Sequence, residues 1–185
     1  MPKRRRVQFA SLEDVGRESQ ALLKSGYQRV GQWSLGTLTD HLGKALVYSC
    51  EGFPRHWSRP VQRILRRLFL KKLLSREQTR WRFPAPIGVD LHVSDPDGVA
   101  SLLDGIERFQ RQGSPRSQHP VLGELSREQW LQFHFWHCEH HLSFLLPATK
   151  QVSCTTPQMS DVSANGGELR SVIAYPVSFP RRSEG

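Results

Sequence analysis

The chain has 185 residues and carries 26 Lys or Arg against 17 Asp or Glu, a formal net charge of +9 at pH 7. This length predicts one domain that is large enough to bury a core without disulfide staples. No apolar run approaches the ~18–20 residues that span a bilayer, and three widely spaced cysteines argue against a disulfide framework or a zinc ribbon. We therefore expect a cytoplasmic protein with a moderate bias towards anionic partners.

Apolar residues that recur at helical spacing predict the first two helices. Residues 1–9 are basic and lack this period, so they are expected to form a flexible arm. Ser11 is the expected N-cap of the first helix, and Gly26 is expected to end that helix. Ser34 caps a second helix that is expected to run to about Tyr48.

The middle of the chain predicts two more helices separated by a loop. Pro60 begins a basic amphipathic segment in which apolar residues recur at helical spacing. Residues 77–94 lack a period and are expected to form a long surface loop, which in a compact domain is often functional. Asp95 is the expected cap of the next helix, with Pro96 at its first helical position and Gly113 at its end.

The last predicted helix has a distinct start. Ser126 and Gln129 form a capping box, and the helix is expected to run to Pro147. Because this helix is apolar nearly all round, it should lie deep in the fold. Residues 148–185 are expected to be a mostly disordered tail, since much of this segment is rich in polar and small residues. The predicted fold is therefore all-α, a bundle over residues 10–147 with an extra basic helix and a disordered C-terminal tail.

Four of the eight histidines lie within eight residues of the last predicted helix. Residues four apart on an α-helix differ by about 40° in direction, so His137 and His141 can point at one ion. Imidazole suits Zn, Ni, Fe and Cu, and a third ligand must come from another helix. His41, in the middle of the second predicted helix, is the best candidate, because bundles build metal sites from inward side chains on facing helices. Three ligands with open positions are typical of a catalytic site.

Each of these histidines also has a structural interpretation. A single buried histidine such as His41 is more often a hydrogen-bonded core residue than a ligand. We expect His134 and Tyr48 to lie beside the ligands or to line the pocket, with His92 as an outside candidate in the long loop. Glu139 is expected to be solvated.

The chain resembles a known superfamily in three stretches. The segment Trp-His-Cys-Glu-His-His at 136–141 resembles the last-helix signature of the DinB/YfiT-like metal-binding four-helix bundles. Residues 31–34, Gly-Gln-Trp-Ser, followed by Asp-His-Leu at 40–42, are similar to their second-helix motif. The stretch His-Pro-Val-Leu-Gly at 119–123 resembles an uncharacterised subfamily, and the similarity runs over roughly residues 10–147. It implies a DinB-like four-helix bundle.

The resemblance also implies a function. In this superfamily the second-helix histidine and the HxxxH pair bind a divalent metal, a role that transfers to His41, His137 and His141. Some members use the metal to activate a low-molecular-weight thiol and act as thiol transferases or thiol-dependent isomerases. We therefore expect a metal-dependent enzyme with a Zn, Ni, Fe or Mn ion, a small-molecule substrate and a low-molecular-weight thiol as a candidate cofactor. A homodimer is compatible with the sequence.

Residues 55–82 hold ten Arg or Lys and one acidic residue. This stretch could bind nucleic acid through phosphates, lie on an anionic membrane, or guide an anionic substrate through Arg63, Arg66 and Arg67. We favour a helix packed on the bundle with a charged outer face, because no nucleic-acid motif of known geometry is present. The alternative to an enzyme is a non-catalytic basic binding module for nucleic acid or an anionic surface.

Overall fold

The computed structural model describes residues 3–74, 87–112 and 117–148. These all belong to the first of two units into which the chain divides, Met1–Lys150 and Gln151–Gly185. The predicted C-terminal tail lies almost entirely outside the described residues, as does most of the predicted loop at 77–94. The described part is mainly helical. Its elements, in chain order, are α1 (Leu12–Ser25), β1 (Tyr27–Arg29), α2 (Leu35–Glu51), α3 (Arg59–Leu74), α4 (Asp95–Arg111), α5 (Arg127–Leu142) and β2 (Leu145–Pro147).

Two short strands, which the sequence did not predict, accompany the helices. β1 and β2 form an antiparallel pair in which Tyr27 lies opposite Pro147 and Arg29 lies opposite Leu145. The last helix therefore ends at Leu142, one turn earlier than expected. Strands of three residues are too short for an alternating pattern, so the sequence offers no periodic signal for them.

Three helix starts follow the predicted chemistry. The Ser11 hydroxyl accepts a hydrogen bond from the Asp14 N–H, and the Asp14 carboxylate accepts one in return from the Ser11 N–H. Ser34 caps α2 through its hydroxyl oxygen, and Ser126 caps α5 in a capping box. Each cap satisfies backbone donors that the first helical turn leaves without partners.

The start of α4 differs from the prediction. Ser94 is the N-cap, and Asp95 is the first residue of the helix. The Asp95 carboxylate instead accepts hydrogen bonds from the Gly36 N–H at 2.7 Å and from the Tyr27 hydroxyl at 2.8 Å. The Tyr27 hydroxyl oxygen in turn accepts the Leu35 N–H at 2.9 Å. Asp95 thus helps to cap α2, a helix 59 residues earlier in the chain.

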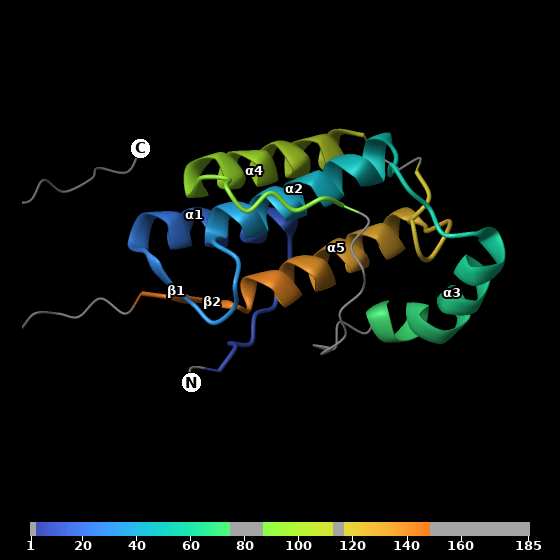
Figure 1. The fold of residues 1–185 in the computed structure, drawn as a ribbon, viewed down its shortest axis with the longest axis horizontal. Coiled ribbons are helices and arrows are strands. Elements are labelled where there is room, and N and C mark those ends of the chain that lie inside the picture. Colours follow the sequence, from blue (N-terminus) through green and yellow to red (C-terminus); the bar gives the residue numbers. More distant parts are fainter. Residues whose placement is uncertain (1–2, 75–86, 113–116, 149–185) are drawn as a thin grey trace, which may run out of the picture. The chain divides into compact units, whose positions relative to one another are not determined.

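α2 and α4 lie side by side at very short range (Figure 1). A Cβ built on Gly43 would lie 2.5 Å from the Ser101 carbonyl oxygen, and one on Gly105 would lie 2.7 Å from the Gly43 carbonyl oxygen. Gly36 and Gly98, each seven residues earlier on its helix, are in equally close contact. Glycine is therefore required at these contacts, because any side chain would push the two backbones apart.

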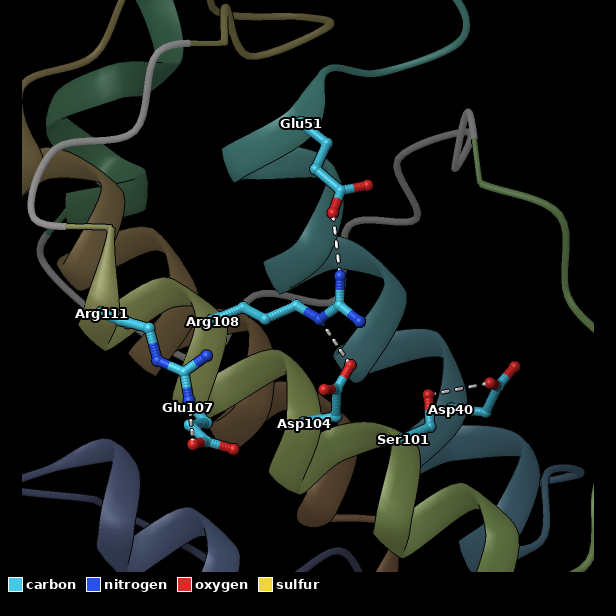
Figure 2. Close-up of polar contacts among 7 residues, drawn as sticks. All are labelled: Asp40, Glu51, Ser101, Asp104, Glu107, Arg108 and Arg111. Atoms are coloured by element: carbon cyan, nitrogen blue, oxygen red, sulfur yellow. Dashed lines mark hydrogen bonds and ion pairs between the residues drawn. The ribbon is translucent and has the colours of Figure 1, made fainter.

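Polar contacts also join α2 and α4 (Figure 2). The Ser101 hydroxyl donates to Asp40 at 3.1 Å, and Arg108 bridges Glu51 of α2 at 3.0 Å and Asp104 of α4 at 2.8 Å. The Arg108 contacts are exposed and contribute little to stability. α2 itself continues to Glu51, beyond the predicted end near Tyr48.

The core lies between α1, α2, α4 and α5. α5 is buried along much of its length, as expected, while α3 contacts α5. None of the described helices is both long and apolar enough to cross a bilayer. The largest core side chains that are almost fully buried are Leu22, Leu35, Leu38, Leu42, Leu46, Leu102, Phe109, Trp130, Leu142 and Leu145.

Residues 3–9, expected to be a flexible arm, contact the fold in the structure. The Arg5 N–H donates to the Ser143 carbonyl at 3.2 Å, and the Phe9 N–H donates to the Glu139 carboxylate at 2.9 Å. The Phe9 side chain is buried in the core. The guanidinium of Arg4 lies 4.4 Å above the Phe144 ring. This segment therefore packs along the C-terminal half of α5.

Candidate metal site

Three histidines from two helices converge. α2 supplies His41, and α5 supplies His137 and His141 one turn apart. One ligand atom from each ring lies within 4.8 Å of the others, and the Nε2 atoms of His41 and His137 are 3.2 Å apart. Two nitrogens bound to one tetrahedral zinc ion lie about 3.3 Å apart, so this spacing fits a shared ion. The group could hold a metal ion.

The histidine group is partly enclosed. His41 is buried, whereas His137 and His141 are half-buried. The Trp33 ring stacks on His141 with ring centroids 5.3 Å apart and an interplanar angle of 8°. Trp33 also meets the edge of His41 at 5.3 Å. The group is therefore covered on one side by an aromatic ring and reaches solvent through its α5 members.

Burial keeps the three imidazoles neutral. It lowers the pKa of His41 to about 4, against the opposing effect of the nearby Asp40 carboxylate. The pKa values of His137 and His141 lie well below the ordinary value, first because of burial and then because the rings lie beside one another. A neutral imidazole has the free lone pair that a metal ion requires.

The second ring nitrogens of two of these histidines lack polar support. Within residues 3–74, 87–112 and 117–148, no hydrogen bond reaches the buried Nδ1 atoms of His41 and His137. Metal-bound histidines usually donate this N–H to a carboxylate or a carbonyl. Here the rings are held by aromatic packing instead, such as the Phe133 ring 5.4 Å from His137.

The other predicted pocket residues lie in different surroundings. His134 is fully enclosed, 3.2 Å from the Ser49 hydroxyl and stacked on Trp130 with centroids 5.5 Å apart. Tyr48 is half-buried with its ring 5.8 Å from that of Phe53. His92 is exposed in a turn, where its backbone N–H donates to the Asp90 carboxylate. None of the three shares a described ring contact with His41 or His141.

Two residues of the region were not foreseen. Glu139 was expected to be solvated but is buried, because the docked N-terminal segment covers it. Trp33 was noted only as part of a motif, although its ring stacks on His141. Its place immediately before the cap of the helix that carries His41 was the available signal. Such a residue often packs against that helix.

The predicted anion-binding arginines lie on α3. Arg63 and Arg67 are exposed, and the half-buried Arg66 donates through its guanidinium to the Glu124 carbonyl. They line one helix, and the described contacts do not bring them to the histidine group.

The fold and this site together define a mainly helical protein whose three-histidine group could hold a metal ion. A family model described as "Protein of unknown function (DUF1569)" matches residues 1–148. Because this match covers most of the chain, the protein belongs to that family. No curated protein and no solved structure matches the chain significantly.

Proposed function

We propose that this protein is a divalent-metal-dependent enzyme whose ligands are His41, His137 and His141. The observation that supports this most directly is the convergence of three buried or half-buried neutral imidazoles, with two Nε2 atoms 3.2 Å apart. Neutral imidazoles concentrated in one place are costly to bury without partners. A shared ion would occupy their lone pairs.

The site would leave coordination positions free. A divalent ion held by three imidazoles lowers the pKa of a water or thiol that binds in an open position. His41 is buried on α2, while His137 and His141 are half-buried, so a substrate would reach the ion from their side. The Trp33 ring, which stacks on His141, would restrict that approach.

The resemblance to DinB/YfiT-like bundles belongs to the same proposal. It supports Zn, Ni, Fe or Mn as the ion and a low-molecular-weight thiol as a cofactor. The reaction would then be a thiol-dependent transfer or isomerisation, or a hydrolysis. The arrangement of ligands on the second and last helices of the bundle is the pattern that this resemblance implies.

Elemental analysis of the purified protein tests the site. We expect about one Zn, Ni, Fe or Mn per chain, lost in both His41→Ala and His137→Ala. His92→Ala is the matched control, because this exposed histidine lies outside the group and should leave the metal content unchanged. Circular dichroism of each variant checks that the helices persist.

Two results would contradict the proposal. A wild-type protein without metal, even after reconstitution with each of these ions, would leave the basic binding module as the better explanation. Equal metal loss in His92→Ala and His137→Ala would show that the bound metal is not specific to the three histidines.

A further inference from the structure

The outward side of α3 carries a row of exposed apolar side chains. Val61, Ile64 and Leu68 are 37%, 60% and 63% exposed, whereas most large aliphatic residues of the other described helices are buried. Their spacing of three and four residues places them on one narrow stripe of the helix. Trp57, just before α3, is 41% exposed. Exposing such an apolar stripe to water is unfavourable, and a contiguous exposed stripe indicates a surface that binds a partner.

A row of positive charge runs beside this stripe. Arg63, Arg67 and Lys71 are exposed and follow one another at four-residue spacing, which aligns them along the helix. α3 contains six Arg or Lys and no Asp or Glu. The outer surface of α3 therefore combines exposed apolar side chains with cations, and no acidic residue of the same helix pairs with these cations.

The inner side of α3 fixes this orientation. Gln62 is buried and donates through its side-chain amide to the Pro120 carbonyl at 3.1 Å. Arg66 donates to the Glu124 carbonyl, and Leu70 packs against the cluster of Leu122 and Trp136. The helix is thus attached to α5 and the loop before it (Figure 1). Because successive residues of an α-helix differ by about 100° in direction, the stripe lies on the opposite side of α3.

We propose that α3 binds the surface of an anionic lipid bilayer. Val61, Ile64 and Leu68 enter the boundary between headgroups and acyl chains, and Arg63, Arg67 and Lys71 contact the lipid phosphates. A helix with an apolar face and neighbouring cations binds such a surface both by burying apolar area and by electrostatic attraction to the anionic lipids. Trp57 lies two residues before α3, and tryptophan favours the interface between water and lipid.

Other partners fit these features less well. Nucleic acid would contact the cations, but its phosphates offer nothing to Ile64 and Leu68. A second copy of the chain could cover the stripe, but pairing two α3 helices would bring two rows of cations together without acidic partners on either helix. A bilayer that contains anionic lipid can bind the apolar stripe through its acyl chains and the row of cations through its headgroups. This inference is independent of the histidine site.

Co-sedimentation of the full chain with lipid vesicles tests the proposal. We expect binding to vesicles of equimolar phosphatidylcholine and phosphatidylglycerol, and at least about tenfold weaker binding to pure phosphatidylcholine. Leu68→Ser should weaken binding to the anionic vesicles by about tenfold. Leu91→Ser is the matched control, because Leu91 is 64% exposed but lies outside α3.

The charge row has a matched pair of variants as well. Arg67→Gln with Lys71→Gln should reduce binding to anionic vesicles by about tenfold or more. Arg29→Gln with Arg127→Gln removes the same charge from exposed positions on β1 and α5 and should have a much smaller effect. All these side chains are exposed, so unchanged melting temperatures should accompany each substitution.

Several outcomes would overturn the inference. One is the absence of binding to anionic vesicles, and another is an equal loss in Leu68→Ser and Leu91→Ser. A tighter affinity for duplex DNA or single-stranded RNA that Leu68→Ser does not change would assign α3 to nucleic acid. A dimer in analytical ultracentrifugation that Leu68→Ser dissociates would assign the stripe to a second copy of the chain.

Discussion

His119 illustrates a buried imidazole that serves structure. Its Nδ1 accepts hydrogen bonds from the N–H groups of Val121 at 3.1 Å and Leu122 at 3.0 Å, inside a turn that its own backbone closes with Gly123. The acceptor role requires the neutral ring with its proton on Nε2. Burial, followed by the nearby His56, lowers the pKa of His119 to about 3. This residue therefore organises the loop before α5.

A dependence of stability on pH follows from this lowered pKa. Between pH ~6.5 and ~3 only the unfolded chain takes up the proton of His119, so folding is disfavoured as the pH falls. In His119→Asn the amide oxygen can still accept the two N–H groups, but it does not titrate. We expect the difference in unfolding free energy between wild type and His119→Asn to shift against the wild type by about 1.4 kcal/mol per pH unit below pH ~6.5.

Urea unfolding at about pH 7, 6 and 5 measures this difference. The control is His92→Asn, because His92 is exposed and shares no described contact with His119. A gap between wild type and His119→Asn that stays constant over this range would show that the ring is not held neutral.

At the scale of elements, the contact between α2 and α4 depends on the four glycines that face each other. Gly36 and Gly43 are seven residues apart on α2, and Gly98 and Gly105 repeat that spacing on α4. The close approach brings the α2 backbone against Ser101. Because His41 lies two residues before Gly43, any separation of these helices also moves a predicted ligand.

We expect Gly43→Ala to destabilise the fold by about 1–3 kcal/mol, since the added Cβ would lie 2.5 Å from a backbone oxygen that cannot rotate away. The better helix propensity of alanine offsets up to about 1 kcal/mol of this cost. Gly88→Ala is the matched control, because nothing lies within 4 Å of the Cβ position there. Thermal unfolding compares the two variants, and equal melting temperatures would rule out the close contact.

Most helices were predictable because their starts use local chemistry. Ser11, Ser34 and Ser126 each cap a helix within three residues of themselves, so a short window of sequence contains the whole signal. Asp95 was misassigned because its partners, Tyr27 and Gly36, lie 68 and 59 residues away. The glycines repeat at a seven-residue spacing on each helix, which is visible in the sequence. This spacing predicts a close helix contact only once it is known that α2 packs against α4.

The histidine group shows the same limit at the scale of the molecule. The four-residue spacing of His137 and His141 indicates a shared direction on one helix, but His41 is 96 residues away from His137. His41 could be predicted as the third ligand because bundles build metal sites from facing helices and because of the family resemblance. In the structure the three rings lie close together. The stacking of Trp33 on His141 depends on packing between elements, so no local pattern specified it.

An ion bound at this group would join α2 to α5 and stabilise the whole fold. A ligand that binds only the folded state at about 100 times its Kd adds about 2.7 kcal/mol to the free energy of unfolding. For a chain of this size we expect removal of the metal with a chelator to lower the melting temperature by about 5–10 °C.

Differential scanning calorimetry with and without EDTA measures this shift, and added Zn, Ni, Fe or Mn should restore the higher melting temperature. The same chelator should leave His137→Ala unchanged, because that variant has already lost a ligand. His140→Ala is a stringent control, since His140 is adjacent in sequence to His141 but lies outside the three-histidine group. A chelator effect that persists in His137→Ala would place the stabilising ion elsewhere in the chain.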